Sequence, residues 1–369
     1  MIDGRWLYLP DQVSAPGETL RELLDERGIT QRDLSDRMGR PTKTINEIVK
    51  GKAQITPETA VQLERALGLP AAFWNEREAH YRGYLARVEA ERRAARWLPW
   101  LNRLPLTDLM LLGAMPKVRL TDANRRALLD AALKFFGVAS PDDWERVYAR
   151  PQAAYRRTRP QQSDRAAIAA WLRLGELAAE RCECGRFDEK RFRDTLGKIR
   201  ALTVHQPENF EQEMRRLCAE AGVVLALVPE IRRAHVSGAA RWLNARPVIQ
   251  LSLYGKANDR FWFTFFHEAG HILLHGRGEV FLDDFGVDGK ESEFEHQANR
   301  FAAEFLIPHE FESQLHTLTT ESAIRRFAEK LGIHPGIVVG RLQHDGVLPY
   351  RTPLNHLKVS FRWVSQTNA

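Results

Sequence analysis

The sequence predicts a mainly α-helical fold with a small α+β part, and three observations support this prediction. Short segments with helical periodicity and clear end signals fill residues 17–68. Two apolar runs with strand character, residues 223–228 and 248–253, precede a long apolar segment at 259–275. Hydrophobic residues make up 44% of the 369 residues, enough for more than one core. We therefore expect an N-terminal helical bundle, a helical middle region, a domain with a small sheet and a C-terminal helical unit.

Changes in composition divide the chain into four predicted parts. Residues 1–90 form a helical module. Residues 91–204 are helical, rich in Arg and Trp, and interrupted by prolines, and we interpret them as a linker or sensor region. Residues 205–312 change to strand-like runs followed by a histidine-containing helix. Residues 313–369 return to short helices and end in a basic, aromatic tail. Within them, residues 323–342 form either a second helix-turn-helix-like unit or a helical cap that packs on the preceding domain. No period repeats often enough to indicate a solenoid.

Charge and cysteine content limit the classes of protein that fit. The formal net charge is +6, which is compatible with nucleic-acid binding. Three cysteines are too few, and odd in number, for a disulfide framework. Residues 1–10 include Asp3 and no long apolar stretch, so no signal peptide is expected, and no apolar run approaches the length of a membrane span. We predict a soluble, cytoplasmic protein with no membrane partner.

The N-terminal module carries good helix boundaries. Helices are expected over residues 17–27, 31–38, 41–50 and 57–67. Thr30 is a suitable N-cap for the second helix, and Thr56 followed by Pro57 is a typical start for the fourth. Two short helices joined by a tight, glycine-containing turn form the helix-turn-helix unit, whose second helix enters the major groove of DNA.

This unit predicts a set of DNA-contacting side chains. Thr42, Lys43 and Asn46 point outward from the third helix and are side chains that can contact base edges. Gln31 and Lys50 lie at helix ends, where phosphate contacts are expected. The alternative is a small helical bundle without a nucleic-acid partner.

Four sequence segments carry a family resemblance, namely residues 20–34, 43–52, 55–60 and 67–74. They resemble the XRE helix-turn-helix family, in particular the HigA-type antitoxin repressors. The resemblance implies a double-stranded DNA operator and a homodimer on paired half-sites. The turn departs from the family pattern, because Gly39-Arg40-Pro41 stands where an apolar residue and then Ser or Thr are usual. This departure affects the expected base contacts more than DNA binding itself.

The middle region permits two interpretations. Arginines are interleaved with aromatic residues, namely Trp97, Trp100, Trp144, Tyr148, Tyr155 and Trp171. Such a pattern can bind single-stranded nucleic acid by stacking, but a solvated helical face over core aromatics looks the same, and we favour the second interpretation. Cys182 and Cys184 lack zinc-site spacing and a second pair, so they are interpreted as ordinary cysteines at a helix end.

The long apolar segment contains His267-Glu268-Ala269-Gly270-His271. On a helix, His267 and His271 lie one turn apart on the same face, so both imidazoles can reach one ion. Glu268 is rotated by about 100° from His267 and flanks the ion where a general base is needed. The alternative is a core helix with two hydrogen-bonded histidines.

A catalytic zinc requires three protein ligands and an open position, so a third ligand must lie elsewhere. Residues 293–308 predict a second amphipathic helix, on which Glu295 can be a ligand and Asn299, one turn later, can support one. Competing ligands nearby are Glu291, Glu293, His296 and Glu304. His275 is expected to support His271 or to be structural rather than to bind the ion.

The combined pattern resembles the ImmA/IrrE family of metallopeptidases. The family pattern pairs HExxH with a later E-x-x-x-N-x-F-A-A helix that ends in Pro, as residues 295–308 do here. The resemblance covers about residues 205–350 and implies a zincin-like endopeptidase. It also implies that His267, His271 and Glu295 are metal ligands and that Glu268 is the catalytic base. Zinc is the expected ion, although manganese can occupy the same ligand set.

Together the two resemblances imply a DNA-binding transcriptional regulator that cleaves a repressor or partner protein. The circuit would be one of stress, phage defence or toxin–antitoxin control. The alternative is an antitoxin-type repressor whose metal-binding fold is a sensor or interaction module without proteolysis. A peptidase would also need an oxyanion-stabilising donor, and the candidates are Tyr254, His235, His296 and Arg300.

Overall fold

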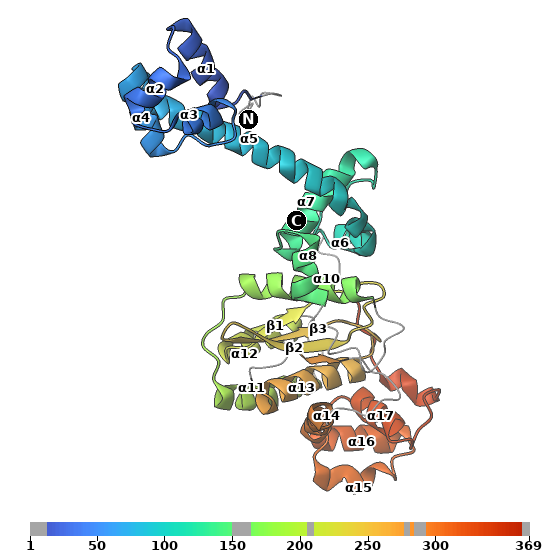
Figure 1. Ribbon diagram of the computed structural model, residues 1–369. Helices are drawn as coiled ribbons and strands as arrows, with labels where there is room; N and C mark the ends of the chain where they lie inside the picture. Colours follow the sequence, from blue (N-terminus) through green and yellow to red (C-terminus); the bar gives the residue numbers. More distant parts are fainter. Residues whose placement is uncertain (1–12, 150–163, 205–209, 277–280, 284–292, 364–369) are drawn as a thin grey trace, which may run out of the picture. The chain divides into compact units, whose positions relative to one another are not determined.

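The computed structural model describes residues 13–149, 164–204, 210–276, 281–283 and 293–363. The chain divides into two compact units, Met1–Arg96 and Trp97–Ala369 (Figure 1). The finer division at residues 90, 204 and 312 stays a prediction. Within the described ranges no helix is both long and apolar enough to cross a membrane. The fold is mainly helical with a small sheet, as predicted.

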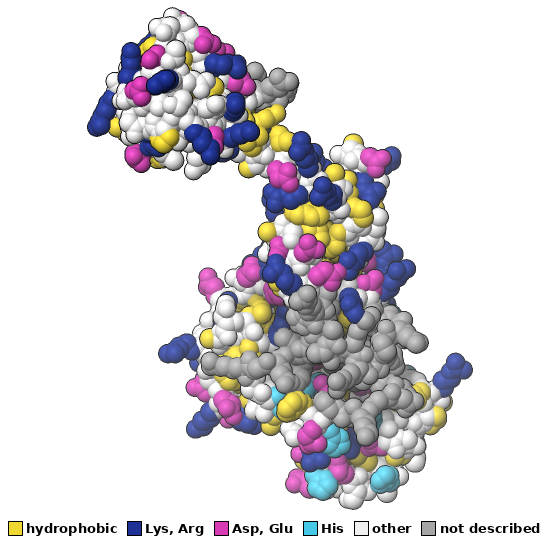
Figure 2. All heavy atoms as spheres, in the orientation of Figure 1, with side chains coloured by type: hydrophobic (Ala, Val, Ile, Leu, Met, Phe, Trp, Pro, Cys, Tyr) yellow, Lys and Arg dark blue, Asp and Glu magenta, His cyan; other side chains and the backbone are white. Residues whose placement is uncertain are grey.

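The first unit is a helical bundle. Its helices are α1 (Pro16–Glu26), α2 (Gln31–Met38), α3 (Thr42–Val49), α4 (Pro57–Leu67) and the long α5 (Ala71–Trp97). Leu20, Leu34, Ile45, Leu63 and Trp74 are buried together and form its core. Lys and Arg side chains are spread over the face of this unit that Figure 2 shows.

The helix boundaries in this unit follow from capping. The Thr30 side chain accepts a hydrogen bond from the Asp33 backbone N–H, and the Asp33 carboxylate accepts one from the Thr30 N–H, which makes a capping box. Gly39 ends α2 in the left-handed conformation at φ 62°, which glycine adopts without strain. The predicted helices therefore match the observed ones to within one or two residues.

The second unit begins with short helices around an aromatic cluster. They are η1 (Leu98–Arg103), α6 (Leu106–Leu111), α7 (Asp122–Phe136), α8 (Pro141–Trp144) and η2 (Glu145–Ala149). Trp100 and Trp144 meet edge to face at a centroid distance of 5.9 Å, and Phe136 packs against both. Trp100, Trp144 and Tyr148 are buried, so these aromatic residues belong to a core and do not form a stacking surface. Tyr155 lies outside the described residues.

A four-stranded sheet lies at the centre of the second unit. Its strands are β1 (Val224–Leu227), β2 (Gly238–Leu243), β3 (Arg246–Leu251) and β4 (Phe281–Asp283), in the order β1-β3-β2-β4. β1 is parallel to β3, whereas β2 is antiparallel to β3 and to β4. β1 and β3 correspond to the two predicted strands. β2 and β4 were not predicted, since the β2 sequence has no β-branched residue and places Arg241 in a buried strand.

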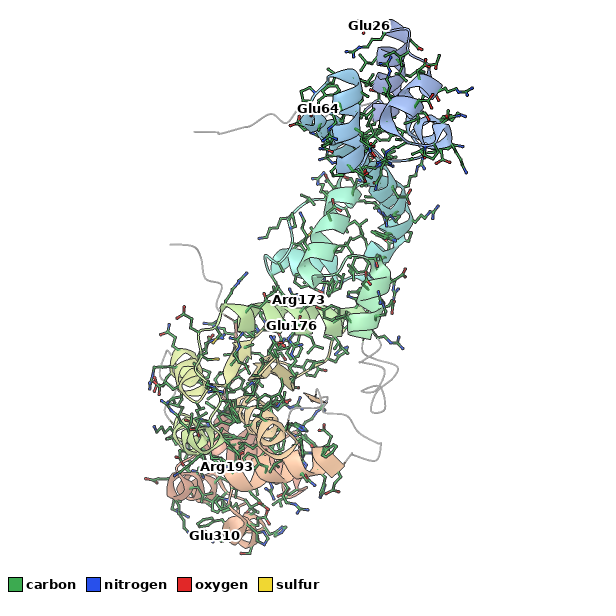
Figure 3. The ribbon with its side chains drawn as sticks, turned by 60° about the vertical axis from the view of Figure 1, so that its left-hand side comes forward. Glu26, Glu64, Arg173, Glu176, Arg193 and Glu310 are labelled. Atoms are coloured by element: carbon green, nitrogen blue, oxygen red, sulfur yellow. The ribbon has the colours of Figure 1, made fainter. Side chains whose placement is uncertain are left out.

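Helices cover both faces of the sheet (Figure 1). α10 (Arg165–Arg181) packs on one face, so closely that a Cβ on Gly175 would overlap the Gln250 side chain of β3. Arg173 and Glu176 lie near each other on this helix (Figure 3), 2.8 Å apart between Nη1 and Oε2. α12 (Phe210–Glu220) and α13 (Asn258–Leu274) pack on the other face, and α11 (Glu189–Ala201) contacts α12.

The C-terminal helices complete the core around α13. They are α14 (Glu293–Leu306), η3 (His309–Phe311), α15 (Glu312–Leu315), α16 (Glu321–Leu331), α17 (Pro335–His344) and η4 (Pro353–Leu357). Phe327 of α16 and Val338 of α17 are buried in the same core as Phe265 of α13. A Cβ on Gly340 would lie 2.4 Å from the Asp259 carboxylate, so α17 approaches the start of α13 closely. These contacts fit a packing role for residues 323–342.

Candidate metal centre and DNA-contacting helix

Two histidines of α13 form the base of the candidate metal centre. His267 and His271 are one helical turn apart, and each side chain is 1% exposed. Their Nε2 atoms are 2.9 Å apart. Burial of the whole helix face around them, including Phe265 and Ile272, fixes the two rings in this position.

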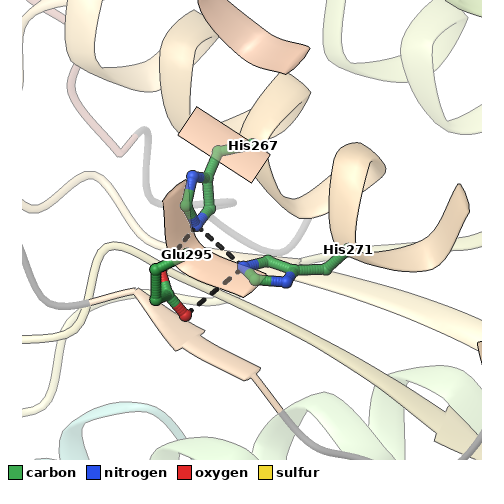
Figure 4. Close-up of side chains that lie close together, drawn as sticks. All are labelled: His267, His271 and Glu295. Atoms are coloured by element: carbon green, nitrogen blue, oxygen red, sulfur yellow. Dashed lines mark hydrogen bonds and ion pairs between the residues drawn. The ribbon is translucent and has the colours of Figure 1, made fainter. Parts of the chain in front are cut away.

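Glu295 of α14 completes the cluster. Its carboxylate oxygens lie 3.3 Å from His267 Nε2 and 3.5 Å from His271 Nε2 (Figure 4). Among the described residues these are the three potential ligands that converge, with all ligand atoms within 4.8 Å of one another. Tetrahedral zinc with bond lengths of about 2.0–2.1 Å places its ligand atoms roughly 3.3 Å apart. The donor set and its spacing therefore fit a single zinc-sized ion.

Small residues allow α14 to approach α13. A Cβ on Gly270 would lie 3.1 Å from the Phe301 ring, and Ala298 and Ala302 are fully buried at the contact. Because Glu295 precedes Ala298 by about one turn, the close approach of the helices brings its carboxylate to the histidines.

The electrostatics of the cluster favour the protonation state that a metal needs. Burial lowers the pKa of His271 to about 4, so its imidazole is neutral near pH 7. Burial alone would raise the pKa of Glu295, but hydrogen bonds from His267 and His271 outweigh it and lower that pKa to about 2. A neutral imidazole and a carboxylate are the forms in which His271 and Glu295 can bind a cation.

His275 lies one turn beyond His271 and supports it. The Nδ1 atoms of the two rings are 2.9 Å apart, and His275 Nε2 is 3.1 Å from Gln297 Oε1 on α14. A hydrogen bond on the far nitrogen of a ligating histidine fixes the orientation of its ring. This position fits the supporting role that the sequence indicated for His275.

Glu268 is fully buried beside the cluster and lies against the backbone of β2. A Cβ on Gly238 would lie 2.5 Å from Glu268 Oε1 and 2.5 Å from Thr264 Cγ2. Position 238 therefore has room for glycine alone without movement of the Glu268 side chain. Gly238 has no role in the sequence analysis, because β2 was not predicted and its glycine therefore had no strand in which to be noticed.

Of the described candidates for the third metal ligand, Glu295 is the one that lies beside the two histidines. Glu293, His296 and Glu304 are exposed and are not part of the three-residue cluster, and Glu291 lies outside the described residues. Asn299 is half-buried on α14, one turn after Glu295.

The candidate oxyanion donors also differ in their surroundings. The His235 ring meets the Tyr254 ring edge to face at a centroid distance of 5.7 Å, and both side chains are half-buried. Arg300 and His296 are exposed.

Of the predicted DNA-contacting residues, Thr42, Lys43 and Asn46 lie on α3, Lys50 follows its last residue, and Gln31 begins α2. Thr42, Lys43 and Lys50 are exposed, whereas Asn46 and Gln31 are half-buried. Ile45, Ile48 and Val49 on the opposite side are buried in the core of this unit, so α3 presents a polar face outward.

The start of α3 shows the consequence of the unusual turn sequence. Pro41 is the N-cap and supplies no side-chain hydrogen bond to the helix. The Thr42 hydroxyl instead donates to Ser35 Oγ at 3.0 Å, and Ser35 Oγ donates to the Arg40 carbonyl. These bonds tie α3 to α2 in place of a conventional cap.

Comparisons with known proteins match two separate parts of the chain. Residues 20–74 match the model of a helix-turn-helix family, and residues 228–343 match the model described as an IrrE N-terminal-like domain. The chain thus contains an N-terminal helix-turn-helix domain of the XRE type and a C-terminal IrrE-like domain. The second match contains His267, Glu268, His271 and Glu295.

Similar individual proteins were found for the N-terminal part. An uncharacterized HTH-type transcriptional regulator of Escherichia coli (strain K12), YddM, is 32% identical over 59 residues, which are 16% of this chain and 63% of that protein. The antitoxin HigA of Pseudomonas aeruginosa, solved with its higBA promoter, is 28% identical, covering 22% of this chain and 90% of that one with a TM-score of 0.22. A HigA-family antidote protein of Coxiella burnetii is 24% identical, covering 23% and 94%, also with a TM-score of 0.22.

Proposed function

We propose that this protein is a DNA-binding transcriptional regulator whose C-terminal domain is a metal-dependent endopeptidase. In this proposal His267, His271 and Glu295 hold the ion, Glu268 is the catalytic base, and Asn299 supports the ligands. The observation that carries the proposal is the convergence of these three ligands beside a fully buried Glu268. Zinc is the expected ion, with manganese as the other candidate.

The residues of the site divide the chemistry of peptide-bond hydrolysis among them. When bound, the ion supplies Lewis acidity that polarises the scissile carbonyl and makes water more acidic. The Glu268 carboxylate accepts a proton from the attacking water and then delivers it to the nitrogen of the leaving amine. Burial of Glu268 against β2 holds its carboxylate in one orientation, which general-base catalysis requires.

The N-terminal domain gives the peptidase its proposed context. A domain that binds an operator would place the peptidase in a genetic circuit. We therefore propose that its substrate is a repressor or a toxin–antitoxin partner protein, in a stress, phage-defence or toxin–antitoxin circuit.

Proteolysis is tested with a Glu268→Gln variant of the full chain. We expect the variant to bind zinc as the wild type does, because Glu268 is not a ligand, and to cleave a candidate partner repressor at least about 10²-fold more slowly. Metal content by mass spectrometry and cleavage on gels are the two readouts. His271→Ala is the matched control and should lose both metal and cleavage. If wild type and Glu268→Gln process every candidate partner identically, the metal-binding fold is a sensor or interaction module instead.

DNA binding by α3 is the second part of the proposal. Lys43 and Asn46 would contact base edges, with Thr42 beside them, while Gln31 and Lys50 would contact phosphates. Two copies of the chain would occupy paired half-sites as a homodimer.

A gel shift on the DNA upstream of the protein's own coding sequence tests this assignment. Lys43→Ala combined with Asn46→Ala should weaken specific binding by roughly 10²-fold, since each base-contacting side chain contributes about 1–3 kcal/mol. Arg65→Ala removes an exposed positive charge from α4 and is the matched control, expected to bind nearly as the wild type does. Equal affinity of the double variant and the control would exclude α3 as the recognition helix.

A further inference from the structure

A small cavity lies where the β2–β3 pair meets α13. Ser237 immediately precedes β2, Ser252 immediately follows β3, and the Ser252 backbone N–H donates to the Ser237 carbonyl at 2.8 Å. Both residues line the cavity together with Thr264 of α13. Its volume is about 10 Å³, which is room for one group of the size of a water molecule.

Two of the side chains that line the cavity have unsatisfied hydroxyl groups. Ser237 is 4% exposed and Thr264 is 2% exposed. Among the described residues, neither Ser237 Oγ nor Thr264 Oγ1 has a hydrogen-bond partner. A buried hydroxyl without a partner costs free energy, so such groups usually bond to ordered water when the protein offers nothing else. One group in this cavity would therefore serve both hydroxyls.

Ser252 provides a third partner for the same group. Its Oγ donates to the Val236 carbonyl at 2.6 Å and accepts from the Tyr254 backbone N–H at 3.0 Å. A hydroxyl oxygen accepts two hydrogen bonds, so Ser252 Oγ retains one lone pair for a donor in the cavity. A buried water makes about three hydrogen bonds, which matches the three hydroxyl groups here.

The charges around the cavity also select its occupant. Lys256 and Arg260 line it, and no carboxylate does. A cation is therefore an unsuitable occupant, whereas water or a small anion such as chloride is compatible with the lining.

Thr264 connects this cavity to Glu268. The two residues are one helical turn apart on α13. A Cβ on Gly238 would lie 2.5 Å from Thr264 Cγ2 and 2.5 Å from Glu268 Oε1, so the methyl group and the carboxylate lie against the same point of the β2 backbone. A hydrogen bond to the Thr264 hydroxyl fixes the side-chain rotamer, and the rotamer determines where the methyl group packs.

We propose that the cavity holds one ordered water molecule that bonds Ser237, Ser252 and Thr264, and that Thr264 is thereby a positioning residue for Glu268. The water site follows from the three hydroxyl groups alone. The positioning role rests on the proposed function, in which Glu268 is the catalytic base.

The direction of a stability change tests the water site. Thr264→Val removes the hydroxyl group and changes the side-chain volume and helix propensity little. If a water molecule bonds this hydroxyl, the variant should lower the urea midpoint of the second unit by roughly 0.3–0.5 M. If the hydroxyl is unpaired in a dry cavity, its removal leaves the midpoint unchanged or raises it.

Thr203→Val is the matched control. Thr203 is 1% exposed, its Oγ1 likewise has no hydrogen-bond partner among the described residues, and it does not line this cavity. The control variant should have a midpoint equal to or above that of the wild type. A Thr264→Val midpoint at or above the wild-type value, or an equal loss in both variants, would overturn the proposal.

A double variant tests whether the hydroxyl groups share one water. Ser237→Ala and Thr264→Val should each lower the midpoint, and together they should lower it by less than the sum, because both remove bonds to the same molecule. Additive losses would contradict a shared water. The same losses in chloride-free buffer are expected, and losses that occur only with chloride would identify an anion as the occupant and overturn the proposal.

The positioning role is tested by kinetics on a partner repressor that the wild type cleaves. Thr264→Val should keep its zinc content and KM and lower kcat roughly 10-fold, because a displaced base affects the chemical step and not substrate binding. An unchanged kcat, or equal changes in kcat and zinc content, would exclude this role. If the wild type cleaves no partner, the proposed function and the positioning role fail together, while the urea measurements still decide the water site.

Discussion

At the scale of single residues, the contact between Gly238 and Glu268 determines the shape of the candidate active site. The β2 backbone passes so close to the carboxylate that a Cβ would lie 2.5 Å from it. Because Glu268 is fully buried, its side chain cannot move into solvent to relieve an overlap. Gly238 thus constrains Glu268, the proposed catalytic base, from a strand that precedes α13 in the sequence.

Gly238→Ala should impair the base more than the metal ligands. The added methyl group forces Glu268 or β2 to move, with an expected loss of about 1–3 kcal/mol in the free energy of unfolding. Cleavage of a partner protein should fall while zinc binding is retained. Chemical denaturation, metal analysis and the cleavage assay measure the three effects.

Gly197→Ala is the matched control for this variant. Gly197 lies within α11, and nothing is within 4 Å of the Cβ that alanine would add. Alanine is favoured over glycine in a helix by up to about 1 kcal/mol, so this variant should be equally or more stable. If Gly238→Ala and Gly197→Ala have the same stability, zinc content and rate of cleavage, the close approach of β2 to Glu268 does not matter for function.

At the scale of secondary-structure elements, a buried polar network joins α10 to the sheet. Arg241 of β2 is 5% exposed, and its Nη1 lies 2.9 Å from Glu176 Oε1. Gln250 of β3 donates to the Trp171 carbonyl at 2.6 Å and accepts from Arg241 at 3.3 Å. A buried guanidinium needs such partners, because the cost of removing it from water is high.

Glu176→Gln should therefore destabilise the second unit strongly. The variant leaves the Arg241 charge buried without its counter-charge, and we expect a loss of about 3 kcal/mol in the free energy of unfolding. The comparison is Glu189→Gln, which breaks the exposed Glu189–Arg193 pair on α11 and should cost only roughly 0.3–0.5 kcal/mol. Urea denaturation of both variants distinguishes them, and equal losses would show that burial of Arg241 does not depend on its carboxylate partner.

At the scale of the whole molecule, the proposed DNA-contacting helix α3 and the candidate metal centre belong to different compact units. A metal bound to the native state stabilises the unit that holds its ligands and leaves the other unit unaffected. Metal dependence of unfolding thus reports on the second unit separately.

Zinc should raise the stability of the second unit alone. At a free zinc concentration 100 times the Kd, the expected gain is about 2.7 kcal/mol. Calorimetry with zinc or with a chelator should show one transition that shifts and one, from the helix-turn-helix unit, that does not. In the Glu295→Gln variant, the zinc-induced shift of this unfolding transition should become smaller or disappear. A shift as large as that of the wild type would show that zinc binds at another site.

The sequence by itself determined the local features of this protein. Helix ends follow from caps such as Thr30 and Gly39, because capping depends on residues within one turn of each other. The spacing of His267 and His271 likewise places both on one helix face without reference to the rest of the chain. β1, β3 and the long α13 were readable from their apolar patterns for the same reason.

Only the tertiary structure decided which residues of separate helices and strands contact one another. Which acid of α14 meets the histidines depends on how α14 packs against α13, and small residues such as Gly270 and Ala302 set that distance. β2 and β4 are strands because their neighbours pair with them, which no local pattern in residues 238–243 reveals. The contacts of Gly238 with Glu268 and of Arg241 with Glu176 join residues tens of positions apart, so their partners became visible only in the folded chain.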